Sequence, residues 1–277
     1  MRSEPRTTIF PMTMNLFVPT RLIVFSVILL LLFSCGKEIE DPYPPSSPQW
    51  IPKSEVEVWP ERGIDAEPGN VIYLEWYPNP EPDIDGYALY RKAESDTLER
   101  FEQVAYLSIS DPFQSSTSYR DEDALVTNQI ERYDYYLKAK DTGGNLSPPG
   151  DTLDYALLNR IGSSTMDPQS LTDTLNTERE FTWAYGYNIA MEDYVLTILD
   201  AQSQALIIRD AFQPTQYIGG TERWTFHPYW KVENGDSIWV DLQSGHTYQW
   251  RIDMQADYDG NIERTGSESN WCYFTVR

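Results

Sequence analysis

The sequence predicts an all-β protein in which two tandem β-sandwiches follow a signal segment and a proline-rich tether. The first evidence is alternation: every second residue is aromatic or apolar in YDYYLKAK, which begins at Tyr133, and in YQWRIDMQA, which begins at Tyr248. A period of two with one polar face is typical of antiparallel strands that are covered on one side. We therefore expect the alternate residues Gln249, Arg251 and Asp253 to face solvent.

A repeat gives the second line of evidence. A Tyr follows a Trp eleven residues later in each half of the chain, as Trp76 with Tyr87 and Trp183 with Tyr194. Each alternating strand is followed by a Gly-Asn turn, and the 15 Gly and 19 Pro residues supply further turn signals. Short strands separated by turns predict sandwiches, and the repeat predicts two of them.

Residues 1–34 have the features of a secretory signal. The apolar run 22–33 covers roughly 18 Å as a helix, against a hydrocarbon core of about 30 Å. Three arginines, the last of them Arg21, provide the basic flank that precedes the apolar region of such signals. The lead before Arg21 is long, and translation from Met12 or Met14 would leave a conventional signal.

The sequence LFSCG ends this run and resembles the lipobox of bacterial lipoproteins, in which a Leu lies three residues before a Cys. The resemblance implies that Cys35 carries lipid and becomes the mature N-terminus. The alternative is an ordinary signal, or a short anchor with an incidental Cys. If Cys35 carries lipid, Cys272 has no partner for an intramolecular disulfide, and we expect it to be a small buried side chain.

The residues after Cys35 predict a tether over 35–49. This segment is rich in proline, which makes a linker semi-extended, and it has no apolar periodicity. Its charged cluster at 37–41 resembles the short acidic signal with which some diderm bacteria send lipoproteins to the cell surface. We therefore expect a lipid-anchored protein of the bacterial outer membrane that faces either the periplasm or the exterior.

The charge of the chain excludes some partners. It has 43 acidic and 21 basic side chains and a formal net charge of −22. A body this acidic repels phosphate backbones, which argues against nucleic-acid binding. It also repels anionic lipid, so we expect the lipid on Cys35, and not a basic face, to hold the protein at the membrane.

The repeat resembles the fibronectin type III family. Trp76 on an early strand, DIDGYALYR on the next and YDYYLKAKDTGGNLSPP near the end carry the resemblance, which covers 50–158. It covers 163–277 more loosely, because DAFQPTQYIGGTERWTFHPYWKVENGDSIWV departs from the pattern, so a neighbouring immunoglobulin-like type fits the second domain equally well. The resemblance implies that the hydroxyl of Tyr133 ties back to the backbone. It implies a structural core that includes Trp76, Tyr87, Tyr133, Trp183, Tyr194 and Tyr248.

The sequence offers no motif for catalysis, and we expect no enzyme. It has two histidines, no Gly-x-Ser-x-Gly, no His-Glu-x-x-His, no Cys-x-x-Cys and no glycine-rich phosphate loop. The turns DIDG, DED and DYDGN place carboxylates at alternate positions, as calcium ligands do. None provides a complete ligand set, so we expect no metal and no cofactor besides the lipid, and we assign these residues to turns.

The insertion ERWTFHPYWKVENGDSIWV in the second domain is rich in aromatic residues. Trp224 and Phe226 alternate as residues of a core strand would, and we expect Trp239 to be in the core too. Tyr229 and Trp230 are adjacent, so one of them should be exposed in a strand. Exposed flat aromatics stack on sugar rings and anchor interfaces. Tyr229, Trp230 and Trp224 are therefore candidates for a glycan- or peptide-binding platform, with extra core as the alternative.

These observations predict a non-catalytic lipoprotein whose two sandwiches act as a binding, adhesion or scaffold module at the bacterial envelope, with a protein or glycan partner. The alternative is a surface glycan-binding lipoprotein that resembles accessory binding proteins of polysaccharide-uptake systems. A third reading is an enzyme fragment or hydrolase accessory subunit, because a glycosidase needs only two carboxylates at the right separation.

Overall fold

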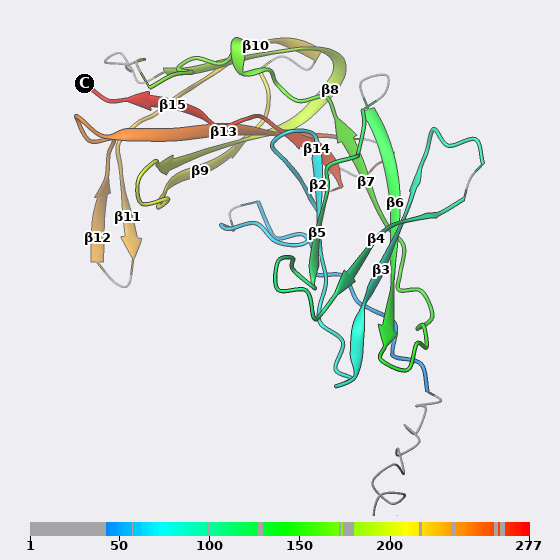
Figure 1. The fold of residues 1–277 in the computed structure, drawn as a ribbon. Helices are drawn as coiled ribbons and strands as arrows, with labels where there is room; N and C mark the ends of the chain where they lie inside the picture. The colour runs from blue at the N-terminus through cyan, green and yellow to red at the C-terminus, as the bar shows by residue number, and fades with distance from the viewer. Residues whose placement is uncertain are drawn as a thin grey trace, which may run out of the picture. The chain divides into compact units, whose positions relative to one another are not determined.

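The computed structural model confirms the all-β class (Figure 1). It describes residues 43–56, 58–98, 100–126, 130–171, 173, 180–215, 218–233, 236–257, 260 and 264–277. The predicted signal 1–34 and Cys35 lie outside these residues. Within them, one short 3-10 helix, η1 (Ser163–Thr165), is the sole helical element. Among the described residues, no helix is long and apolar enough to span a bilayer.

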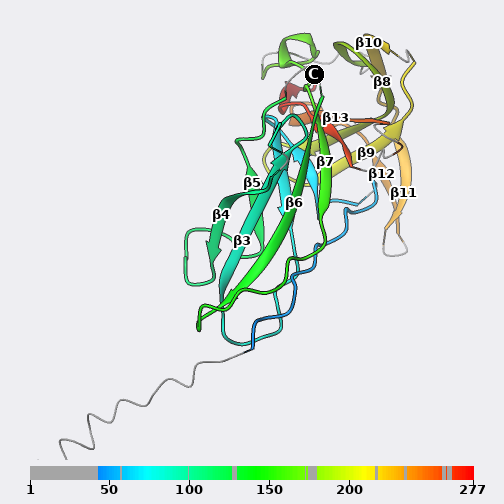
Figure 2. The same ribbon diagram turned by 90° about the vertical axis from the view of Figure 1, so that its right-hand side faces the viewer.

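The first sandwich has a three-stranded sheet in the order β1-β2-β5 and a four-stranded layer in the order β4-β3-β6-β7. Figure 2 shows β3, β4, β6 and β7 side by side. Its strands are β1 (Asp65–Glu67), β2 (Val71–Glu75), β3 (Ile84–Ala93), β4 (Glu102–Ser108), β5 (Ser118–Asp121), β6 (Ile130–Asp141) and β7 (Leu153–Leu158).

Alternation in β6 builds the core of the first sandwich. Every second residue of this strand is buried, beginning at Glu131 and including Tyr133. Trp76 and Tyr87 are buried as well, with ring centroids 5.6 Å apart in an edge arrangement. The hydroxyl of Tyr133 donates to the carbonyl of Leu125 (2.7 Å) and accepts from its amide (2.8 Å). These two bonds close the corner that the family resemblance implies.

The second sandwich is organised around one very long strand. Its strands are β8 (Glu180–Asp200), β9 (Leu206–Phe212), β10 (Ile218–Thr225), β11 (Tyr229–Glu233), β12 (Asp236–Val240), β13 (Thr247–Ala256), β14 (Thr265–Glu268) and β15 (Cys272–Thr275). The first part of β8 pairs with β10, and the last part pairs with β9 and β13. Trp183 and Tyr194 therefore lie on one strand, whereas Trp76 precedes β3, the strand that carries Tyr87.

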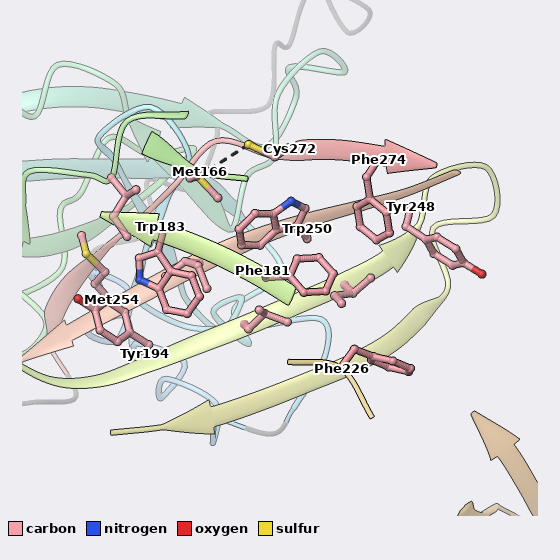
Figure 3. Close-up of a cluster of buried hydrophobic side chains, with 14 of the residues drawn as sticks. Met166, Phe181, Trp183, Tyr194, Phe226, Tyr248, Trp250, Met254, Cys272 and Phe274 are labelled. Carbon is pink, nitrogen blue, oxygen red and sulfur yellow. Dashed lines mark hydrogen bonds between the residues drawn. The ribbon is translucent and has the colours of Figure 1, made fainter. Parts of the chain in front are cut away.

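The two parts of β8 enclose the core of the second sandwich (Figure 3). Phe181 from the first part contacts Trp250 of β13, with ring centroids 5.0 Å apart, and Phe274 of β15 at 5.3 Å. Trp183, Tyr194 and Tyr248 are also buried here. Cys272 is a buried free thiol beside Met166, with the two sulfur atoms 3.8 Å apart.

A separate two-stranded hairpin, β11–β12, projects from the second sandwich (Figure 1). Trp230 pairs with Trp239 across it. The expectation that Trp239 is a core residue is wrong, because its side chain is 47% exposed. In a hairpin that no third strand joins, a residue on the outer face has no layer to cover it.

The two sandwiches share a continuous sheet within one compact unit, Tyr43–Arg277. β7, the last strand of the first sandwich, pairs in parallel with β14, and the register joins Ala156 to Thr265 and Leu157 to Gly266. A Cβ at Gly266 would lie 2.5 Å from the carbonyl oxygen of Met254. Met254 lies on β13, so only glycine at this position lets β14 approach β13 this closely.

The prediction that one side of β13 faces solvent is wrong. Gln249, Arg251 and Asp253 are all buried. The alternation of the strand is real, but both of its faces are covered. The segment before β1, which belongs to the first sandwich, lies over the polar face and supplies Glu61 to Arg251. Polar residues in a strand can thus mark a buried junction as well as a surface.

Candidate functional site

The most unusual feature of the described chain is a group of charged side chains between the sandwiches, here called the junction cluster. Its residues come from both sandwiches and are Lys53, Glu61, Asp65, Arg209, Arg251, Asp253 and Glu268. Charged residues are seldom buried unless they are paired. Here each one has an oppositely charged partner.

Arg251 is the centre of the junction cluster. Its Nη2 donates to Glu61 Oε2 (2.5 Å), and its Nη1 donates to Glu268 Oε2 (2.5 Å). Its Nε lies 2.9 Å from Asp253 Oδ1. Because one planar guanidinium faces three carboxylates, its direction is fixed, and so is the direction of the segment that carries Glu61.

Arg209 of β9 makes a second connection to the first sandwich. Its guanidinium pairs with Glu61 and lies 3.2 Å from Asp253 Oδ2. Its Nε also donates to the carbonyl of Val56 (2.5 Å). Arg209 therefore binds the segment before β1 through the backbone carbonyl of Val56 and the side chain of Glu61.

Two tryptophans cover the guanidinium groups. The rings of Trp59 and Trp271 lie 5.4 Å and 5.0 Å from the Arg251 guanidinium carbon, and they contact each other in a T-shaped arrangement with ring centroids 6.4 Å apart. Trp59 also covers Arg209 at 5.8 Å. Cation–π contacts of this kind strengthen when water is excluded. The two rings, one from each sandwich, cover the junction cluster.

A buried tyrosine connects the junction cluster to the shared sheet. Tyr155 of β7 is fully buried, and its hydroxyl accepts from the amide of Ala66 (3.0 Å) and donates to Asp65 Oδ1 (3.2 Å). Lys53 Nζ lies 2.6 Å from the same carboxylate oxygen. Burial is the first cause that raises the pKa of Tyr155 well above its usual value, so the hydroxyl stays a donor.

Two acids of the junction cluster hold their protons unusually strongly. Desolvation, together with the Asp253 and Asp65 carboxylates, raises the pKa of Glu61 to about 7 against the opposing pull of the arginines. Desolvation and then Asp253 raise the pKa of Glu268 well above its usual range. Burial and like charges disfavour the ionised form of an acid, and each cause acts here.

The junction cluster contains the one acidic group of the described residues that has the spacing of a metal site. Oxygens of Glu61, Asp65 and Glu268 lie within 4.8 Å of one another. All three carboxylates already bind cationic groups, because Arg251 holds Glu61 and Glu268 and Lys53 holds Asp65. A divalent cation would have to displace them, so the donor set fits ion pairing better than metal coordination.

Two carboxylates of the acidic turns that suggested calcium ligands bind other protein groups. Asp85 accepts from Tyr106 Oη (2.6 Å) and Lys140 Nζ (3.0 Å). Asp121 binds Arg91 at 2.7 and 2.8 Å through its two oxygens. These carboxylates fix strand positions in the first sandwich.

The predicted aromatic platform divides into different environments. Trp224 is half-buried, its Nε1 donates to Asp210 Oδ2 (2.7 Å), and its ring lies 5.8 Å from Phe181. Tyr229 is half-buried against the core of the second sandwich. The side chain of Trp230 lies outside the described residues. Trp239, which sequence analysis placed in the core, is the exposed aromatic of this region.

One turn brings together a serine, an aspartate and a histidine. Asp200 Oδ1 accepts from Ser203 Oγ (2.8 Å), and Asp200 Oδ2 lies 3.8 Å from His246 Nδ1. Catalytic triads place the histidine between the serine and the acid, whereas here the acid lies between the other two. The amide of Ser203 is the first cause of the lowered pKa of Asp200, which is a turn contact.

An open pocket of about 410 Å³ lies beside the chain that joins the sandwiches. Its polar lining comes from both of them and includes Asn70, Asn159, Arg160 and Thr165. Arg160 donates from Nη1 to Asn270 Oδ1 (3.0 Å), which adds another contact across the join.

Comparisons with known proteins give no family and no activity. No protein-family model matches the chain, and no curated protein matches it. The FN1-FN3 domains of chicken CNTN1 are similar at a TM-score of 0.31 and 12% identity, covering 84% of this chain and 67% of that chain. The spore cortex lytic enzyme SleM of Clostridium perfringens is similar at 0.27 and 20% identity, covering 44% and 31%. The strand order of the first sandwich is that of a fibronectin type III-like β-sandwich.

Proposed function

We propose that the protein is a non-catalytic lipoprotein of the bacterial envelope, and that its two sandwiches work as one rigid body that presents a binding face to a protein or glycan partner. The observation that carries this proposal is the junction. A shared sheet and a cluster of buried ion pairs join the sandwiches. Domains that are linked only by a flexible join are expected to move independently.

The positions at which the tether and the second sandwich attach to the first sandwich also support the proposed role in presenting a binding face. Ser46, within the predicted tether 35–49, bonds to Asn79 and Glu81 before β3. Ile84 pairs with Asp141 at this end, whereas β7 leaves the first sandwich at its other end, where Leu158 pairs with Ile130. The tether and the second sandwich therefore attach to opposite ends of the first sandwich.

Chain length limits how far the first sandwich can lie from a lipid on Cys35. The eight steps from Cys35 to Tyr43 span at most about 28 Å when extended. The first sandwich would then stay near the membrane, and the second would be held away from it. This arrangement suits a protein that presents its second sandwich to a partner.

The test is exposure on intact cells. Protease is added to cells with and without disruption of the outer membrane, and Cys35→Ser serves as the control for anchoring. Cleavage on intact cells means surface display, and cleavage only after disruption means a periplasmic position. Membrane fractionation of Cys35→Ser that is indistinguishable from wild type would refute the anchored lipoprotein.

A glycan-binding role is the second candidate, and the exposure of Trp239 favours it. The residue lies on a projecting hairpin, and pairing places Trp230 opposite it. Polysaccharides in a native gel should retard the full chain, and Trp239→Ala should abolish the retardation. Tyr77→Ala is the matched control, because Tyr77 is 49% exposed on the first sandwich. Equal retardation of wild type and Trp239→Ala would exclude this hairpin as the platform.

A further inference from the structure

The junction cluster has one more carboxylate than it has cations. The carboxylates belong to Glu61, Asp65, Asp253 and Glu268, and the cations to Lys53, Arg209 and Arg251. We propose that the docked sandwiches keep one proton on this cluster and release it when they part, so that acidic conditions lock the junction and rising pH loosens it. This regulation goes beyond the proposed function and does not depend on lipidation.

The geometry identifies where the proton is held. Glu61 and Glu268 bind two nitrogens of the same guanidinium, that of Arg251, and their oxygens lie within 4.8 Å of each other and of Asp65. Two carboxylates this close, and largely removed from water, do not both ionise readily. The proton belongs to the Glu61–Glu268 pair and not to one residue alone.

Every element packed around Glu61 contributes a charged group, so the acidic and basic groups around it can be counted. The groups that face it are Asp65 of β1, Arg209 of β9, Arg251 and Asp253 of β13, and Glu268 of β14. Three acids and two bases therefore surround one further acid, and Lys53, which pairs with Asp65, is the third base of the cluster. The rings of Trp59 and Trp271 lie over the guanidinium of Arg251. When the junction opens, water reaches these groups and the excess charge no longer needs a proton.

The sign follows from which state binds the proton more tightly. The pKa of Glu61 is about 7 in the docked state, against an ordinary value of 4.5. A raised acid pKa means that docking takes up a proton, so docking is strongest below pH 4.5 and weakens as pH rises toward 7. With these two values, the docking equilibrium should fall about 30-fold between pH 5.5 and 8.5.

Amide hydrogen exchange on the full chain in detergent tests this inference. The amide of Ala156 donates to the carbonyl of Arg264 across the junction (2.8 Å), so its protection reports docking. The amide of Trp76, which donates to the carbonyl of Thr117 inside the first sandwich (3.0 Å), is the internal reference. After correction for intrinsic exchange rates, protection at Ala156 should fall about 30-fold from pH 5.5 to 8.5 while protection at Trp76 changes little.

Two glutamate variants complete the test. Glu61→Gln leaves three carboxylates against three cations, so the cluster no longer needs the extra proton, and the pH dependence at Ala156 should shrink to less than about threefold. Glu102→Gln removes an exposed carboxylate that pairs with Arg100 and should behave as wild type. Constant protection in the wild type, an equal fall at Trp76, or an undiminished fall in Glu61→Gln would each overturn the proposal. The wild-type profile decides the matter even if Glu61→Gln does not fold.

Discussion

Removal of the Arg251 guanidinium is the most direct perturbation of the junction. Arg251→Met keeps much of the side-chain volume and leaves Glu61 and Glu268 without their shared partner. Glu268 is 3% exposed, so water cannot replace the lost contact. Breaking a buried ion pair by removing one partner costs about 3–5 kcal/mol, because the remaining charge is uncompensated. We expect a loss of this size in the free energy of unfolding at pH 7.5.

The loss should depend on pH in a defined direction. The carboxylates that Arg251→Met leaves behind can take up protons, and each unit of pH below their pKa values lowers the cost by about 1.4 kcal/mol. The variant should therefore be less impaired at pH 5 than at pH 7.5. An effect that came from lost packing alone would be the same at both values.

Urea unfolding of the full chain, followed by tryptophan fluorescence, measures the effect. We expect one transition for the wild type and separation into two for Arg251→Met, because each sandwich keeps its own core when the junction fails. Arg100→Met removes an exposed partner of Glu102 and should change stability by no more than about 0.5 kcal/mol. A loss below about 1 kcal/mol in Arg251→Met, or a loss independent of pH, would refute the reasoning.

Three further changes test other parts of the fold. Gly266→Ala places a Cβ against the Met254 carbonyl and should lower stability by about 1–3 kcal/mol in urea unfolding; wild-type stability would contradict the close approach. Tyr133→Phe leaves the Leu125 amide without its acceptor and should cost about 1–3 kcal/mol in thermal unfolding. Burial raises the pKa of Cys272 to about 11, so iodoacetamide at pH 8 should label its peptide in urea and not in the native protein.

The first sandwich was largely predictable from the sequence because its signals are local. Alternation in the strand from Tyr133 reports a buried face directly, and the spacing of Trp76 and Tyr87 places two core residues on successive segments. The bonds of Tyr133 to Leu125 also join residues close in sequence. Each of these features depends on a few neighbouring positions.

The second sandwich was less predictable because its pattern supports two arrangements. Trp183 and Tyr194 repeat the spacing of the first sandwich, yet one strand, β8, carries both. No Pro interrupts β8, whereas Pro78, Pro80 and Pro82 separate Trp76 from β3 in the first copy. Proline cannot donate to a strand ladder, so its absence allows β8 to continue and turn from one layer to the other.

The junction was missed because its partners are far apart in sequence. Glu61 lies in a segment that resembles a linker, and it meets Arg251 about 190 positions later. An alternating strand with Arg and Asp on one face is typical of a surface, and only the position of the first sandwich makes it an interior. The one available sign was chemical: an Arg and an Asp two residues apart on a strand already form a pair that can be buried.

A junction built from charges has a consequence that an apolar junction would not have. The parallel pairing of β7 with β14 is short, and its register joins Ala156 to Thr265 and Leu157 to Gly266. Two paired positions limit sliding only weakly, and apolar surfaces tolerate small shifts at little cost. The ion pairs of Arg251 do not allow such a shift, because it would leave Glu61 as a buried unpaired charge. The junction cluster therefore contributes more to a single relative orientation than to the strength of docking. A fixed orientation of this kind is what the proposed role requires, in which the protein presents one face to a partner.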